Sequence, residues 1–238
     1  MSADQDPWRG RAPLPLWRRH PDLAITLAGL LLLLAWDATG WDLAVVGLFG
    51  DAGGFAWRDA FATSQLLHGG GRVLAWALLG SLAWAAWKAG PGPGPGSAER
   101  WRWLGVMLLC VLAVPLLKQF SHTSCPWDLA RFHGVARYVP HWRWGIVDGG
   151  PGRCFPSGHA VAAFGFFGLY FLWRRHDARR ARHWLLAVLA MGLVYGLGQL
   201  IRGAHYPSHT LWSAWLCWVI CASAAWWMAG RNQATGSQ

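Results

Sequence analysis

Charged residues are scarce in this chain. They make up 13% of its 238 residues, against roughly 25% in an ordinary soluble domain. Acidic residues are the scarcer kind, with 11 Asp and Glu beside 21 Lys and Arg, whereas hydrophobic residues make up 54% of the chain. So few charges argue against a soluble globular domain and indicate a protein of the membrane.

The apolar residues are concentrated in runs that are long enough to cross a bilayer. A hydrocarbon core of ~30 Å needs roughly 17–25 residues of helix. Many of the 20 Trp lie near the ends of the runs, where interfacial aromatics are common. The sequence predicts an all-α polytopic protein with one six-helix domain at 22–229, a polar segment at 1–21 and a tail at 230–238. The predicted spans are about 22–37, 72–89, 102–117, 158–174, 183–201 and 209–229.

The positive charge predicts the orientation in the membrane. With an even number of spans both termini lie on one side, and cytoplasmic segments carry an excess of Lys and Arg. We therefore expect both termini in the cytoplasm of a bacterial inner membrane and the longest polar loop, 118–156, in the periplasm. We expect no cleavable signal peptide and no nucleic-acid partner. The residues that place most of the positive charge on the terminal side are Arg9, Arg11, Arg18, Arg19, Lys88, Arg100, Arg102, Arg174, Arg175, Arg179, Arg180, Arg182 and Arg231.

Three short polar patterns stand at the edges of apolar runs. Lys118 ends one run, Pro156-Ser157-Gly158-His159 begins another, and the segment from Arg202 to His209 lies between the last two. Cleavage of a phosphate ester needs cations and amide groups around the phosphoryl group, a nucleophile and an acid for the leaving oxygen. A neutral histidine can attack phosphorus, and a glycine at a helix start lets an anion approach the backbone amides. These patterns predict one phosphate site.

In the order and spacing of these patterns the chain resembles the type 2 phosphatidic-acid phosphatase superfamily of membrane lipid phosphatases, over roughly residues 100–225. Lys118 matches the lysine of the first family motif, residues 156–159 match the second completely, and His205 matches the nucleophilic histidine of the third. The resemblance implies His205 as nucleophile, His159 as general acid, and Lys118, Ser157 and Gly158 around the phosphate.

Three polar positions depart from the family pattern. Cys125 stands at the arginine of the first motif, Gly198-Gln199 replaces the Ser-Arg pair of the third, and His209 replaces its closing aspartate. We expect Arg202, near Gln199 on the same helix face, and Arg131 to supply the missing guanidinium groups. His209 or Asp128 would orient the nucleophile. These residues complete the expected site as catalytic His205, His159 and His209, with Lys118, Arg131, Ser157, Gly158, Gln199 and Arg202 around the phosphate.

The expected activity is hydrolysis of a lipid phosphate monoester or diphosphate through a phosphohistidine. Undecaprenyl diphosphate, phosphatidylglycerol phosphate, phosphatidic acid and lipid A are the substrates considered, and the sequence does not choose among them. Transfer of the phosphate to another lipid, or lipid binding without catalysis, are the alternatives. No cofactor and no metal is expected, because side chains supply the positive charge. Haem ligation by facing histidines is less favoured, since the histidines stand at span edges among Pro, Ser and cations.

The five cysteines fall into two groups. Cys110, Cys217 and Cys221 lie within predicted spans, where cysteine packs as a small apolar side chain. Cys125 and Cys154 both fall in or beside the predicted periplasmic loop, and an oxidising periplasm permits a disulfide between them. Two free thiols are the alternative.

Overall fold

The computed structural model describes residues 21–236, with side chains described up to Arg231. Within that range every regular element is a helix and no strand forms. The segment predicted at 1–21 falls almost entirely outside the described residues. The helices are α2 (Pro21–Thr39), α3 (Trp41–Val46), α4 (Gly71–Trp87), α5 (Ser97–Lys118), α6 (Val161–Phe164), α7 (Phe167–Trp173), α8 (Ala178–Ile201) and α9 (Pro207–Gly236), with a π-helix, η1 (Ala62–Gly70), and two 3-10 turns, η2 (Pro126–Asp128) and η3 (Ala130–Phe132).

Four of these helices are long and apolar enough to cross a membrane. They are α2, α5, α8 and the part of α9 from Pro207 to Arg231, and each coincides with a predicted span to within about five residues. The helix α4, with 17 residues, follows η1 without a break and covers the predicted span at 72–89 except for its last two residues. The chain is therefore an all-helical protein with several membrane-type helices.

The predicted span at 158–174 forms two short helices instead of one. The chain turns at Gly165 and Phe166, between α6 and α7. The glycines on either side of this turn are closely packed: a Cβ at Gly165 would lie 2.8 Å from the carbonyl of Val161, and one at Gly168 would lie 2.7 Å from Met107. The α6–α7 segment is largely buried among its neighbours, so contacts with the bundle decide its shape more than local periodicity does.

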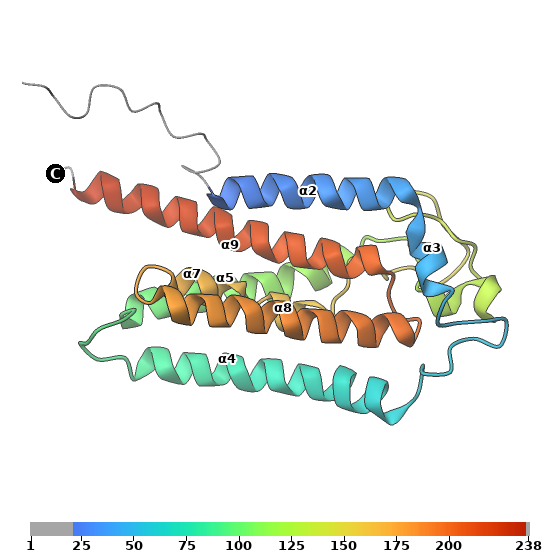
Figure 1. Cartoon of the computed structure of the whole chain (residues 1–238), viewed down its shortest axis with the longest axis horizontal. Coiled ribbons are helices and arrows are strands. Elements are labelled where there is room, and N and C mark those ends of the chain that lie inside the picture. The colour runs from blue at the N-terminus through green and yellow to red at the C-terminus, as the bar shows by residue number, and fades with distance from the viewer. Residues whose placement is uncertain (1–20, 237–238) are drawn as a thin grey trace, which may run out of the picture.

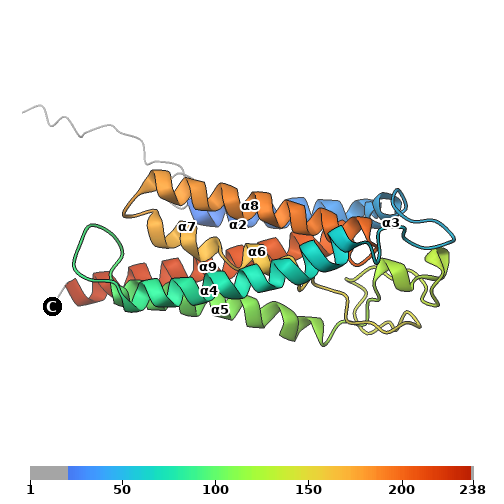
Figure 2. The same ribbon diagram turned by 90° about the horizontal axis from the view of Figure 1, so that it is seen from below.

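The long helices lie side by side, and most of the irregular segments lie at one end of the bundle, opposite the loop between α4 and α5 (Figure 1). Residues 40–61 and 119–160 form this end, which we call the loop end. Helix α2 lies along α9, while α4 lies on the opposite side of the molecule (Figures 1 and 2). The main apolar core lies between α5, α6, α7, α8 and α9. A second, smaller core beneath the loop end includes Val46, Phe55, Phe132 and Tyr206 and fixes the loops on the helix ends.

Candidate active site

The three sequence patterns converge at the loop end. Lys118 is the last residue of α5, His159 lies in the turn just before α6, and His205 lies between α8 and α9. Lys118 and His159 both act electrostatically on His205. The side chain of Lys118 also passes Gly158, where an added Cβ would lie 4.0 Å from its Cδ. The fold therefore brings Lys118, His159 and His205 into one cluster, together with Gly158.

The end of α8 positions His205. The helix stops because Gly203 adopts a left-handed conformation, with φ 73°, which glycine takes at little cost. The amide of Gly203 donates to the carbonyl of Leu200 at 3.0 Å, and that of Ala204 donates to the carbonyl of Gln199 at 2.8 Å. This is a Schellman arrangement. A Cβ at Gly203 would lie 2.3 Å from the ring of Phe55, so a larger residue would displace the turn that leads to His205.

The start of α9 is held by a carboxylate from another helix. Pro207 opens the helix, a position where its missing amide costs nothing. The next amide, of Ser208, donates to Oδ1 of Asp42 at 3.0 Å, and the Ser208 hydroxyl donates to Oδ2. Asp42 belongs to α3 and is buried. A negative charge at a helix N-terminus is favourable, and here it ties the turn that carries His205 and His209 to α3.

The ring of His205 is held through its Nδ1 atom. That atom lies 3.5 Å from Nδ1 of His209 and 3.5 Å from Sγ of Cys154, so Nε2 is left to face a substrate. His205 is only 4% exposed. Burial, followed by the ammonium group of Lys118, lowers the pKa of His205 well below its ordinary value. A neutral imidazole is the nucleophilic form.

A histidine from outside the three patterns joins the cluster. His68, in η1, stacks on His159 with ring centroids 3.6 Å apart, and the side chain of Gln199 lies within hydrogen-bonding reach of it. Burial lowers the pKa of His68, and the guanidinium groups of Arg202 and Arg72 lower it further. Gln199 stands at the position of the arginine in the third family motif. The nearby imidazole of His68 therefore places a nitrogen atom close to where the side chain of that arginine would lie.

Apart from Nε2 of His141, which lies beside the Asp37 carboxylate, three buried nitrogen atoms in this region have no hydrogen-bond partner within the described structure. They are Nδ1 of His68, Nε2 of His159 and Nη1 of Arg202. Buried polar atoms are normally hydrogen-bonded. Donors from three different segments, with Lys118 and Arg72 close by, make a region that suits an anion with several oxygen acceptors.

Arg202 lies near His68 in this cluster, and its guanidinium group has additional contacts. Nε donates to the carbonyl of Arg58 at 3.1 Å, and the group lies 5.4 Å from the ring centroid of Trp127. The side chain is 7% exposed. These contacts fix one edge of the guanidinium group and leave Nη1 as the unpartnered donor.

Ser157 shapes the turn that carries His159. Its amide donates to the carbonyl of His209 at 3.1 Å, and its hydroxyl accepts from the amide of Ala160 at 3.4 Å. The Ser213 hydroxyl donates to the carbonyl of Ser157 at 2.9 Å. The expected helix N-terminus at Ser157 thus begins later, at Val161. The Ser157 amide already has an acceptor, so its contribution lies in joining the segments of His159 and His209.

Two predicted site residues have other contacts in the structure. Arg131 is exposed, and its Nη2 atom lies beside Gly47 at the end of α3, 3.2 Å from where a Cβ would be. The carboxylate of Asp128 accepts from the amide of Cys125 at 3.2 Å within its own turn, and burial raises its pKa. It is His209 that touches His205.

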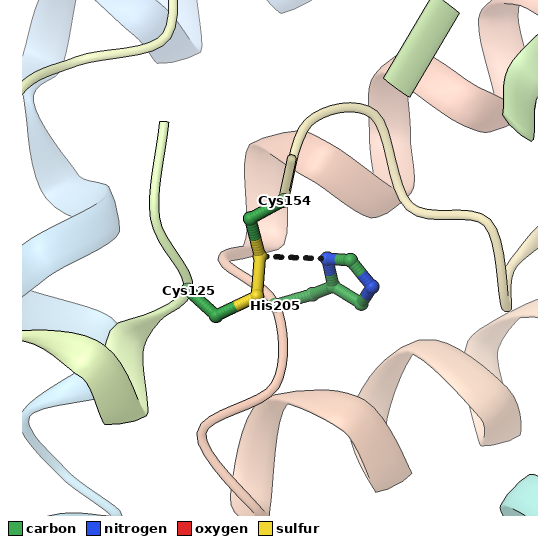
Figure 3. Close-up of side chains that lie close together, drawn as sticks. All are labelled: Cys125, Cys154 and His205. Atoms are coloured by element: carbon green, nitrogen blue, oxygen red, sulfur yellow. Dashed lines mark hydrogen bonds between the residues drawn. A yellow bond between two sulfur atoms is a disulfide. The ribbon is translucent and has the colours of Figure 1, made fainter. Parts of the chain in front are cut away.

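Cys125 and Cys154 form a disulfide beside the nucleophile candidate (Figure 3). Cys154 lies 3.5 Å from Nδ1 of His205. The two sulfurs and the imidazole are close enough together to suggest a metal site, but sulfurs bonded to each other are not thiolate ligands. The disulfide therefore packs against His205, and Cys125, which stands where the family motif has an arginine, forms a covalent link in its place.

Sequence reasoning missed four residues near the site: His68, Arg72, Asp37 and His141. The first two flank the site from η1 and α4. Asp37 and His141 form a buried pair whose Oδ2 and Nε2 atoms are 3.3 Å apart. None of them belongs to a motif. A charged Asp within an apolar run was the one signal that could have drawn attention to Asp37, because such groups are rare in membrane helices unless they have a role.

Comparison with known proteins gives one family. Residues 100–233, more than half of the chain, match the PAP2 superfamily, and the matched segment contains Lys118, His159 and His205. No curated protein and no solved structure matches the chain. The family match agrees with the membrane-type helices and with the cluster at the loop end. The chain belongs to the PAP2 superfamily.

Proposed function

We propose that the protein is an integral-membrane lipid phosphatase that forms a phosphohistidine at His205. PAP2 membership implies phosphatase or phosphotransferase chemistry on phosphate esters. The observation that carries the proposal is the meeting of Lys118, His159 and His205, because Nε2 of His159 and nearby nitrogen atoms of His68 and Arg202 are buried without a hydrogen-bond partner. In the proposed topology α4 and the α6–α7 segment complete six spans, both termini are cytoplasmic, and the loop end faces the periplasm of a bacterial inner membrane.

The proposed reaction has two steps. Nε2 of neutral His205 attacks phosphorus, and His159 gives a proton to the departing oxygen. A bound phosphate dianion brings the negative charge that favours the protonated form of His159. Water then attacks the phosphohistidine, and His159 accepts its proton. Lys118, Arg202, His68 and Gln199 would stabilise the charge on the phosphoryl oxygens.

Arg131 is given no part in the proposed phosphate set. Its exposed guanidinium group lies beside Gly47 and over the ring of Phe132, with CZ 5.5 Å from that ring's centroid. His68, which stacks on His159, takes the place in the set that Arg131 held in the sequence-based prediction. Undecaprenyl diphosphate, phosphatidylglycerol phosphate, phosphatidic acid and lipid A are the substrates to test.

Phosphate release from these four lipids tests the proposal, with His205→Ala as the blank. Wild-type protein should release phosphate from at least one of them, and His205→Ala from none. His159→Ala should slow the reaction by roughly 10²–10⁴-fold, as loss of a general acid does. The loss should be smaller for substrates with good leaving groups. Release by His205→Ala at the wild-type rate would refute the phosphohistidine.

Transfer to a lipid acceptor is the second candidate. The observation that favours it is the burial of His205 and His209, which are 4% and 1% exposed and give water little access. In the same assay a phosphorylated second lipid without free phosphate would identify the transferase.

A further inference from the structure

Position 209 presents a chemical difficulty. The family motif closes with an aspartate, whose negative charge would stabilise the nucleophilic histidine as it becomes positively charged. Here the residue that contacts Nδ1 of His205 is His209, and a histidine supplies no negative charge. The question is whether another carboxylate reaches this pair of rings.

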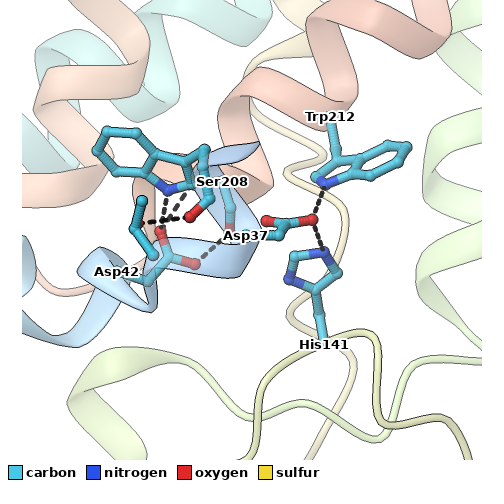
Figure 4. A network of polar contacts seen from close by, with 7 residues as sticks. Asp37, Asp42, His141, Ser208 and Trp212 are labelled. Atoms are coloured by element: carbon cyan, nitrogen blue, oxygen red, sulfur yellow. Dashed lines mark hydrogen bonds and ion pairs between the residues drawn. The ribbon is translucent and has the colours of Figure 1, made fainter. Parts of the chain in front are cut away.

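A buried carboxylate stands at the end of α2, beside the first turns of α9. Asp37 is 8% exposed. Its Oδ2 atom accepts from Nε1 of Trp212 at 3.0 Å and lies 3.3 Å from Nε2 of His141 (Figure 4). Asp37 and His141 come from distant parts of the chain and point toward each other. A carboxylate in this position fixes the imidazole orientation and favours a proton on the facing nitrogen.

His141 connects this carboxylate to the catalytic rings. Its ring stacks on Phe155 with centroids 4.0 Å apart and meets the ring of His209 edge to face at 5.8 Å. Phe155 also meets His209 at 5.2 Å. The order in space is therefore Asp37, His141, His209 and His205, with Phe155 packed against the two middle rings.

We propose that Asp37 and His141 are positioning residues that supply, across space, the negative charge missing from position 209. When Nε2 of His205 bonds to phosphorus and the bond to the leaving oxygen breaks, the His205 ring gains positive charge. Its Nδ1 proton is shared with Nδ1 of His209. Asp37 holds the ring of His141, which packs edge to face against the ring of His209 and fixes its orientation. The Asp37 carboxylate thereby stabilises the positive charge that develops on His205. This inference rests on the proposed function.

A purely structural role for Asp37 is the alternative, because its bond to Trp212 also ties α2 to α9. Asp42 offers a matched control. It is likewise a buried aspartate from this N-terminal region, and it likewise ties its segment to α9, through Ser208. Its described partners are Ser208 and Trp36, and neither is a histidine. Loss of helix tethering alone should thus affect variants at both aspartates equally.

Steady-state kinetics of the full chain in detergent separate these roles. Asp37→Asn and His141→Asn should each lower kcat about tenfold, the scale expected for one charge acting across intervening groups, and leave KM within about twofold. The double variant should lose no more than either single one. Folded Asp42→Asn loosens a tether to α9 without facing a histidine, so it measures the loss of kcat caused by weaker tethering alone, and that loss should be smaller than the loss in Asp37→Asn. Equal losses in Asp37→Asn and Asp42→Asn, or additive losses in the double variant, would overturn the proposal.

Restoring the family residue gives the sharper test. In a His209→Asp background the carboxylate lies directly beside His205, so Asp37→Asn should cost less than twofold. A structural Asp37 would still be needed there, and a tenfold loss would refute the positioning role. If His209→Asp does not fold, the double variant above decides. Absence of phosphate release by the wild type would instead refute the proposed function, whereas an active wild type with an equally active Asp37→Asn would refute this inference alone.

Discussion

The imidazole ring of His68 lies flat against that of His159, with centroids 3.6 Å apart and planes within 17° of each other. His68 lies in η1, before the segment that matches the PAP2 superfamily. Through this contact a residue outside the family motifs reaches the proposed general acid.

His68→Ala should therefore lower kcat/KM for the lipid substrate. A hydrogen bond to a charged group is worth about 1.5–3 kcal/mol, which corresponds to a loss of roughly 10–150-fold. His122→Ala is the control, because His122 is an exposed histidine in the same loop end. Phosphate release by both variants at several substrate concentrations provides the measurement, and equal activity of the two would remove His68 from the site.

Arg202→Lys should lose at least tenfold in kcat/KM although it keeps the positive charge. The donors of a lysine all sit on one nitrogen, so a lysine cannot reproduce the planar spacing between Nε, which bonds to the Arg58 carbonyl, and Nη1, which is free for phosphate. Arg143→Lys, an exposed change in the loop end, should be neutral. Unchanged kinetics in Arg202→Lys would mean that the phosphate is held by other groups.

Acid should destabilise the protein below about pH 6.5. Burial lowers the pKa of His205 and of His68 in the folded protein, so the unfolded chain takes up protons first as the pH falls through the ordinary histidine value of about 6.5. Stability is then full above that pH and decreases below it, by up to about 1.4 kcal/mol per pH unit for each neutral histidine. Thermal unfolding in detergent between pH 5 and 8 measures the slope. A stability that rises toward acid would contradict the prediction.

Cys125 and Cys154 should resist alkylation until the protein is reduced, whereas two free thiols would label at once. Closing a loop with a sequence separation of 29 is worth about 3–4 kcal/mol by chain entropy. Reduction should also lower activity, because Cys154 packs against Nδ1 of His205. Intact mass after alkylation and phosphate release from the same samples test both statements, and the Cys125→Ser/Cys154→Ser double variant should behave like the reduced protein.

A reporter fused after the last residue should behave as cytoplasmic. The excess of Lys and Arg on the side of both termini favours this orientation. The matched experiment places the reporter in the loop between Gly145 and Gly149, which is expected in the periplasm. A periplasmic signal at the C-terminus would move the proposed active site to the cytoplasmic side.

The sequence predicted the helical class and the approximate positions of the long helices, because membrane spans leave a strong apolar signal. It could not predict the break between α6 and α7, which depends on packing against Val111 and Met107. Motif order predicted the approach of Lys118, His159 and His205. Partners from the first part of the chain, such as His68 and Asp37, carry no motif and become visible only when the helices are placed in space.

The two aspartates of the N-terminal region have a consequence for biogenesis. Asp42 meets Ser208 across 166 residues, and Asp37 meets Trp212 across 175. The segments that carry these aspartates are synthesised well before α9, the helix that they hold. Contacts of such long range form late. A nascent chain therefore cannot fix the turn between α8 and α9 until α9 has been made, and the proposed phosphate site takes shape only after that helix has inserted.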